Sequence, residues 1–340
     1  MNPGKIAVAT LAFVMACGAG PSPVATAVLP ATDPGGSMIH VRASNMNELV
    51  TKASAAWQKL AFEEGDGGVL DIQLDPGVYE GMNLVLSDTS VQRRVDVRLR
   101  GGPGVVFSNT AVQLGGGDIV VDGIVFEGHT NGVFLDLAPT TLATISRVSF
   151  VEARATGSGG MTTSQLLTVQ SKDPESTVSL SDVWSVLSTA SDGQPLMSFA
   201  GMNGAIAHVK LERVAIGGGG SSPALSLARS KDLTIVDSVL VMDPGVPMIR
   251  TSTAPAQLRI EGGALVVDSP DTLIISHDGT VPKPLAQLTG VRLSLHTPAE
   301  DHQAGLDGCT IMDAPAKTRF KSWRKPARAL QVPAHGVLVR

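Results

Sequence analysis

Four charged side chains have types and spacing that suit work on an acidic substrate. Lys210 and Glu212 flank an apolar leucine, and Arg259 and Glu261 flank an apolar isoleucine. Alternate side chains of a β-strand point to opposite faces, so all four charged groups should point outward if the apolar residues point inward. We therefore take Lys210 and Arg259 as candidate catalytic residues, and Glu212 and Glu261 as candidate substrate-binding residues.

These candidates belong to separate segments, so their proximity depends on how the segments stack. If both segments are equivalent strands of a repeat, Lys210 and Arg259 lie two strands apart, about 10 Å at the usual spacing. General acid–base chemistry needs groups that converge within hydrogen-bond reach of one substrate. The alternative interpretation is a solvated face of exposed salt bridges, and we favour it over a catalytic pair.

Two other groups of residues could bind a ligand. The histidines His208, His277, His296 and His302 lack the spacing of a metal site, so we expect no metal and no cofactor. Residues 317–328 contain no acid. Six of them are basic: Lys317, Arg319, Lys321, Arg324, Lys325 and Arg328. Two aromatic residues, Phe320 and Trp323, lie between them. This segment could bind an anionic polysaccharide, a lipid headgroup or nucleic acid. We favour a C-terminal cap, in which the two aromatic side chains cover the last coil.

The N-terminal residues predict export. Lys5 precedes an apolar run of 11 residues, Ile6 to Ala16, which is too short to span a bilayer. The run ends in Val14-Met15-Ala16-Cys17, which resembles a bacterial lipoprotein box and makes Cys17 a candidate lipidation site. Ala25-Thr26-Ala27 would instead suit an ordinary signal-peptide cleavage. We favour lipidation over that cleavage and over a buried segment, because Cys17 directly follows the apolar run.

The composition indicates a solenoid-like chain without disulfides. The 340 residues include 37 Gly and 21 Pro, and only 17% are charged, below the roughly 25% of typical soluble domains. A net charge of −5 gives no argument for a nucleic-acid partner. Cys17 and Cys309 are the two cysteines, so removal or acylation of Cys17 excludes an intramolecular disulfide.

One amphipathic helix is expected before the strand-rich part. Asn45 can cap it, and Glu48 follows three residues later, as in a capping box. The expected apolar face consists of Leu49, Ala53, Ala56, Trp57 and Leu60. Because a lone helix needs a surface to cover, we expect it to close the open end of a solenoid.

A six-residue pattern recurs seven times in the strand-rich part. The copies begin at Val121, Ile145, Leu180, Leu211, Ile235, Ile260 and Leu288, at intervals of 24, 35, 31, 24, 25 and 28 residues. Each period holds three short strands, for example Ala224–Ala228, Leu233–Ile235 and Val239–Val241. This periodicity predicts an all-β fold: a single right-handed parallel β-helix of about seven coils, rather than a barrel or a sandwich.

One position of the repeat marks a tight corner. It is occupied in turn by Gly123, Arg147, Asp182, Arg213, Asp237, Gly262 and Gly290. Stacked strands lie about 4.8 Å apart, so the four charged residues should form a column of opposite neighbours. Each exposed pair contributes less than about 1 kcal/mol, and we interpret the column as setting the register of the coils.

Two segments resemble those of a known superfamily. Residues 67–81, GGVLDIQLDPGVYEG, come after the expected helix and contain a strand and a "pGxY" turn. This order resembles the first coil of many pectin-lyase-like proteins. Residues 119–126, IVVDGIVF, are similar to an "i-DGi-f" coil of the same superfamily. The resemblance covers roughly residues 45–300 and implies a right-handed parallel β-helix. It leaves the activity open, because these proteins include lyases, hydrolases, esterases, epimerases, adhesins and phage spikes.

The catalytic motifs of that superfamily are displaced or missing. Residues 77–80, GVYE, place the acid one position earlier than the G-x-Y-x-E of pectin methylesterases. Residues 128–130 and 259–261 each lack a required residue of the polygalacturonase motifs G-H-G and R-I-K, and no acidic cluster suits the calcium of pectate lyases. The expected outward row of the first strand looks inert: Asp136, Thr168, Ser198 and Ser226. Alginate or chondroitin lyases use a Lys/Arg pair on such a face, which is the role that this resemblance implies for Lys210 and Arg259.

Two functions therefore remain as hypotheses. The first is an exported, surface-anchored β-helix body that binds an anionic polysaccharide or another cell-envelope component, or has a structural role, without a specific nucleic acid. The second is a polysaccharide lyase or another glycan-modifying enzyme; a phage-type or trimeric fibre fits the lipoprotein-like start less well.

The expected location is the outer membrane or cell surface, through a lipid anchor alone, or the secreted or periplasmic space. The expected segments are a signal at 1–17 or 1–27, a linker at 18–40, a cap at 41–66, the β-helix at 67–300 and a C-terminal cap and basic segment at 301–340.

Overall fold

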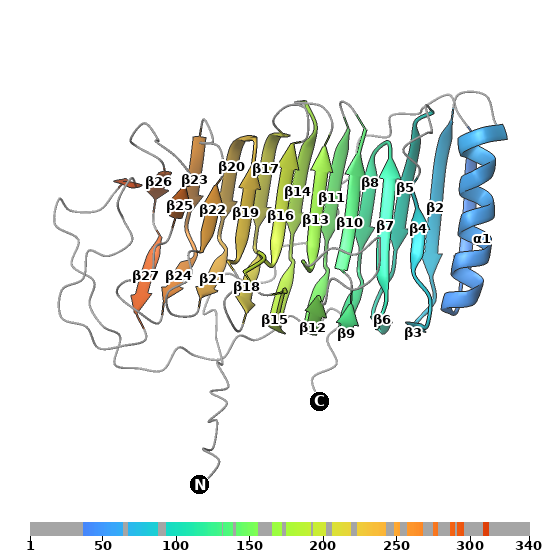
Figure 1. Cartoon of the computed structure of the whole chain (residues 1–340), viewed down its shortest axis with the longest axis horizontal. Helices are drawn as coiled ribbons and strands as arrows, with labels where there is room; N and C mark the ends of the chain where they lie inside the picture. Colours follow the sequence, from blue (N-terminus) through green and yellow to red (C-terminus); the bar gives the residue numbers. More distant parts are fainter. Residues whose placement is uncertain are drawn as a thin grey trace, which may run out of the picture.

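The chain winds through three parallel sheets that form one elongated β-helix, with a helix at one end (Figure 1). The computed structural model describes residues 37–63, 67–87, 93–130, 132–138, 141–155, 165–171, 175–191, 193–201, 206–218, 223–242, 248–251, 257–267, 275–277, 286–289, 291–295 and 309–312. The predicted all-β solenoid with an N-terminal helix is confirmed. In these ranges, no helix is long and apolar enough to cross a membrane.

In the residues that the structure describes, the three sheets contain 11, 9 and 8 strands. Sheet A consists of β1 (Ser37–Ala43), β2 (Gly68–Leu74), β5 (Val95–Arg100), β8 (Ile119–Asp122), β11 (Leu142–Ser146), β14 (Thr177–Ser181), β17 (Ile206–Glu212), β20 (Ser230–Val236), β23 (Gln257–Glu261), β26 (Ala286–Thr289) and β28 (Cys309–Met312). Sheet B consists of β3 (Gly77–Glu80), β6 (Val105–Ser108), β9 (Val125–Thr130), β12 (Ser149–Ala155), β15 (Trp184–Ser188), β18 (Ala215–Gly218), β21 (Val239–Met242), β24 (Ala264–Val267) and β27 (Arg292–Leu295). Sheet C consists of β4 (Leu84–Leu86), β7 (Ala111–Gly116), β10 (Gly132–Leu137), β13 (Leu167–Ser171), β16 (Met197–Gly201), β19 (Leu225–Ala228), β22 (Ile249–Thr251) and β25 (Ile275–His277).

Each coil contributes one strand to each sheet, in the order A, B, C. The eight strands of sheet C close eight three-strand coils within the described residues, from β2–β3–β4 to β23–β24–β25. The seven sequence copies fall on strands of sheets A and B, from β8–β9 to β26–β27, and two coils of the same arrangement precede them. β1 adds to β2 at the end of sheet A, so residues 37–40 of the range 18–40 expected as linker belong to a strand.

Apolar residues at alternate positions of sheet A form a continuous row inside the solenoid. They pair in the order Ile72, Leu99, Val121, Ile145, Leu180, Leu211, Ile235 and Ile260, and each is at most 2% exposed. Complete burial of one such side chain stabilises the fold by about 1.5–3 kcal/mol. This row fixes the register, because a shift by one residue would move every apolar side chain to the outside.

The residues at the corner between sheets A and B adopt a left-handed backbone conformation, whether they are glycine or charged. The non-glycine corner residues have φ between 46° and 55°: Arg147, Asp182, Arg213 and Asp237. Gly123 and Gly262 adopt the same left-handed conformation, which glycine accepts without strain. Each corner N–H donates to a carbonyl of the following coil, as Arg213 does to Val236 at 3.0 Å. These hydrogen bonds hold each left-handed corner against its neighbour.

The charges at this corner pair less regularly than the expected column. The guanidinium of Arg213 donates two hydrogen bonds to Asp182, at 2.8 and 2.9 Å, as the column predicts. Arg147 instead binds Asp122 of the preceding coil, and the hydrogen bond to Asp122 raises the pKa of Arg147. Since the corner of that coil is a glycine without a side chain, the carboxylate just before it takes the place beside Arg147.

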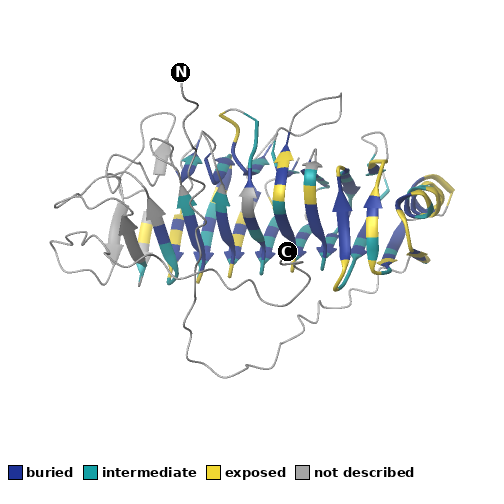
Figure 2. Ribbon diagram, turned by 90° about the horizontal axis from the view of Figure 1, so that it is seen from below, coloured by how far each residue is buried: buried dark blue, intermediate teal, exposed yellow. Residues whose placement is uncertain are grey.

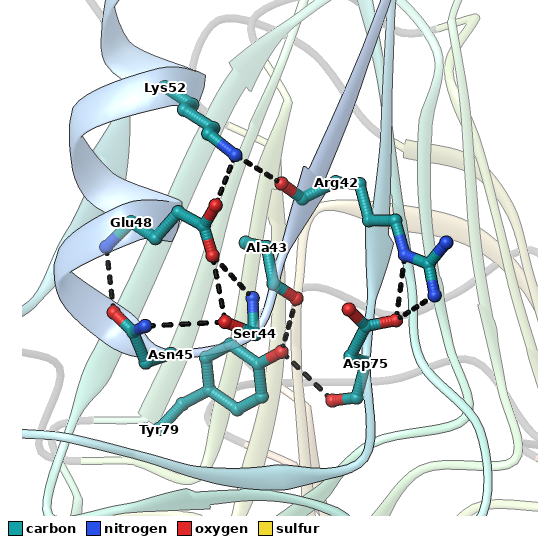
Figure 3. A network of polar contacts seen from close by, with 8 residues as sticks. All are labelled: Arg42, Ala43, Ser44, Asn45, Glu48, Lys52, Asp75 and Tyr79. Carbon is teal, nitrogen blue, oxygen red and sulfur yellow. Dashed lines mark hydrogen bonds and ion pairs between the residues drawn. The ribbon is translucent and has the colours of Figure 1, made fainter.

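The capping helix lies across the end of the solenoid (Figure 1). It consists of α1 (Met46–Gln58) and a π-helical turn, η1 (Lys59–Glu63). The predicted apolar face is confirmed as buried: Leu49, Ala53, Ala56, Trp57 and Leu60. Asn45 caps α1 by accepting a hydrogen bond from the Glu48 N–H at 3.0 Å. The carboxylate of Glu48 reaches back to the N–H and hydroxyl of Ser44, both at 2.9 Å, and also pairs with Lys52 (Figure 3).

This network predicts a pH-dependent contribution of Glu48 to stability. Hydrogen bonds from Lys52 and Ser44 lower the pKa of Glu48 from 4.5 to about 2. A carboxyl group whose pKa is lowered by folding stabilises the fold above its unfolded pKa, and this effect is lost as the pH falls through the folded value. Glu48→Gln should therefore be less stable than the wild type at neutral pH, and the difference should vanish as the pH approaches 2. Urea unfolding over this range measures it, with the exposed Glu63→Gln as control; a difference that is constant with pH would contradict the prediction.

Candidate functional site

The outer face of sheet A carries the four charged residues identified from the sequence. Buried and exposed positions alternate along the strands, so the strands appear banded (Figure 2). Lys210 and Glu212 lie in β17, on either side of a fully buried leucine. Arg259 and Glu261 lie in β23, on either side of a buried isoleucine. All four side chains therefore point away from the core, as expected.

Strand pairing places the two candidate cations in one row. Thr234 of β20 pairs with Lys210 on one side and with Arg259 on the other. Two strand spacings separate the cations, about 10 Å, which agrees with the separation expected from the repeat. Glu212 and Glu261 occupy the neighbouring row in the same two strands. The arrangement is a rectangle with cations along one side and carboxylates along the other.

The two ends of this rectangle differ in their ion pairs. Nζ of Lys210 donates to Glu212 at 2.8 Å, and Glu212 also contacts Arg213. The pKa of Glu212 is lowered, chiefly by the hydrogen bond from Lys210 and against the opposing effect of burial. Arg259 and Glu261 are exposed, and neither forms an ion pair within the described ranges. Arg259 is therefore the candidate cation whose hydrogen-bonding groups remain available to a ligand.

The row of Lys210 continues toward the capping helix and includes an arginine that the sequence patterns did not identify, before it reaches Asp71 and His40. Pairing leads from Lys210 through Ser179, Thr144 and Val120 to Arg98 of β5, and Arg100 lies two residues further along that strand. The first recurring copy of the sequence pattern begins at Val121, and β5 belongs to the coil before it. The two arginines could have been found from residues 95–100, VDVRLR. In this segment apolar residues alternate with polar ones, as they do in the sheet A strands of the later coils.

Sheet C differs from the expectation in one respect. Thr168, Ser198 and Ser226 do share an outward row, but the residue that pairs with Thr168 on β10 is Phe134. Asp136 belongs to the adjacent outward row, where it pairs with Gln170. Asp136 therefore lies on the outer side as expected, but two residues away from the position equivalent to Thr168, because insertions between coils conceal the register of this sheet. Beyond Ser226 the row continues to Arg250, and no group of converging acids occurs on this face within the described residues.

The structure brings no metal-binding group together in the part of the chain that it describes, since no cluster of three or more His, Cys, Asp or Glu occurs there. His208 lies beside Asp232 of the next strand, with 3.1 Å between Nδ1 and the carboxylate. Cys17, the basic segment 317–328, His296 and His302 lie outside the described residues. Searches against protein-family models, curated proteins and solved structures found no match to this chain.

Proposed function

We propose that this chain is an exported β-helix protein that binds an anionic glycan of the cell envelope along the outer face of sheet A. The observation that carries the proposal is the exposed guanidinium of Arg259, which has no ion pair among the described residues and shares a row with Lys210 and Thr234. A guanidinium binds a carboxylate through two parallel hydrogen bonds. A threonine hydroxyl both donates and accepts, and so suits a sugar hydroxyl between two acidic groups.

The layout of this face favours binding over a reaction. Its polar groups are spread over strands that are about 4.8 Å apart, whereas acid–base catalysis needs groups that meet at one substrate atom. An exposed charge pair contributes less than about 1 kcal/mol, so useful affinity requires many weak contacts with a repeating polymer. Such contacts weaken as salt is added, because exposed charges are screened.

The decisive variant is Arg259→Ala, measured by titration of purified protein with polygalacturonate. Loss of one exposed charged contact should weaken binding about two- to fivefold, the equivalent of up to about 1 kcal/mol. Arg154→Ala is the matched control, because Arg154 is an exposed arginine on the outside of sheet B. An equal loss in both variants would mean that net charge alone governs binding. Absence of binding by the wild type to any anionic polysaccharide would refute the proposed function.

A polysaccharide lyase is the second candidate, favoured by the shared row of Lys210 and Arg259. A lysine base must present a free amine to the sugar, whereas Nζ of Lys210 donates to Glu212. Formation of unsaturated product, followed by ultraviolet absorbance, separates the two candidates. Product that forms with the wild type and is lost in Lys210→Ala would establish the lyase; binding without product would favour the glycan-binding body.

The proposal includes export and, at Cys17, attachment to the membrane through a lipid anchor. Its support is the lipoprotein-like sequence around Cys17, which lies outside the described residues. Recovery of the protein from cells entirely in the soluble fraction would contradict the anchor and leave simple secretion.

A further inference from the structure

We infer that Arg98 and Arg100 form a second anion subsite on sheet A, so that a linear polyanion must reach both ends of the face to bind tightly. This inference rests on the proposed glycan-binding function and specifies the ligand as an extended chain of repeating carboxylate groups. Both arginines lie in β5, where Val97 and Leu99 are fully buried and the two charged side chains alternate outward. Two residues of one strand span about 7 Å, so an anion bound at Arg98 also lies near the guanidinium of Arg100, which contacts Asp71 at 3.5 Å.

The carboxylates around Arg98 are already engaged by other cations. Asp75 pairs with Arg42, Asp122 with Arg147, and Asp71 with His40 at 3.2 Å and Arg100 at 3.5 Å. Asp96, two residues before Arg98 and on the same side of the strand, is held by Arg94 at 3.1 Å. Arg98 pairs in register with Asp71, but its half-buried side chain forms no ion pair with any residue that the structure describes. A half-buried guanidinium without an ion pair is favourable for an external anion, because part of its desolvation has already occurred in the folded protein.

The row of outward side chains that joins Arg98 to Lys210 is short and uncharged, whereas the adjacent row contains Asp122 and Glu212, which are paired with Arg147 and Lys210. Arg98 and Lys210 are four strand spacings apart, about 19 Å, and Arg98 and Arg259 are six apart, about 29 Å. The positions between Arg98 and Lys210 are Val120, Thr144 and Ser179, all short side chains. Within this row, no long side chain stands between the two cations.

Two separated subsites make affinity depend on ligand length. A short oligomer reaches one subsite alone, whereas a longer one makes the second contact intramolecularly and gains from a high effective concentration. We expect the affinity for oligogalacturonates to rise at least about tenfold once the oligomer exceeds roughly 29 Å, the separation of Arg98 and Arg259, and to change little below that length.

The test is calorimetric titration of a length series of oligogalacturonates into the wild type, Arg98→Ala and the charge-matched control Arg154→Ala. Arg98→Ala should remove the step in affinity while short oligomers still bind at the Arg259 end, and Arg154→Ala should retain the step. Arg98→Lys, which keeps the charge and the aliphatic stem, should retain most of it and shows that the fold tolerates substitution. A smooth rise with length, or a step that survives in Arg98→Ala, would overturn the second subsite. Those outcomes differ from failure of the proposed function, in which the wild type binds no oligomer and no polymer.

Discussion

Phe126→Ala is expected to lower the free energy of unfolding by about 3–5 kcal/mol, the cost of truncating a fully buried aromatic side chain. Phe126 lies in β9 of sheet B and is completely buried. Its ring centroid is 5.4 Å from that of Phe107 and 5.3 Å from that of Phe150, and Tyr79 extends the column at 5.2 Å from Phe107. Truncation leaves a cavity between two rings that are held by neighbouring coils, so neither ring can easily move in to fill it.

Chemical denaturation followed by circular dichroism measures this loss. Val78→Ala is the control, because Val78 lies in β3 of the same sheet and is 55% exposed. Substitution at an exposed site of this kind should change stability by less than about 0.5 kcal/mol. A cost below about 1 kcal/mol for Phe126→Ala would show that the aromatic column is not closely packed.

The solenoid could be predicted because its signal is local and repeated. In each coil an apolar residue of sheet A, such as Leu211 or Ile260, sits at a fixed distance from a corner that needs a left-handed residue. The capping helix was equally clear, since Leu49 and Trp57 share one face and Asn45 precedes it. Such patterns depend on neighbours along the chain, and therefore survive insertions between coils.

The candidate site was less predictable because its contacts depend on register and on side-chain choice. The row of Lys210 and Arg259 followed from alternation, but the preference of Lys210 for Glu212 depends on side-chain conformation. Arg147 has carboxylates on both sides, Asp122 and Asp182. It binds Asp122, because the corner residue of that coil is a glycine and leaves room for this pair. Asp136 shows the effect of insertions, because a loop of unknown length conceals a shift of two residues.

The close stacking of the first two coils leads to a second large effect, at Gly67. Gly67 has φ of +90°, and a Cβ built there would lie 2.0 Å from the carbonyl oxygen of Arg94. That oxygen also accepts the N–H of Gly68 at 3.2 Å. The side chain of Arg94 is bound to Asp96 at 3.1 Å and to Asp118 at 2.9 Å, which restricts any movement of this segment.

Gly67→Ala should therefore destabilise the fold through two additive causes, and Gly81→Ala isolates one of them. Gly81 has φ of +87°, almost the same as Gly67, but nothing lies within 4 Å of the position of its Cβ. Gly81→Ala should cost about 1–2 kcal/mol, the penalty of a left-handed backbone for an L-residue. Gly67→Ala should cost about 1–3 kcal/mol more, because the added methyl group displaces the Arg94 carbonyl. Equal costs in urea unfolding would mean that the backbone before β2 moves freely, and the stacking of β2 on β5 would then be looser than the pairing of these strands indicates.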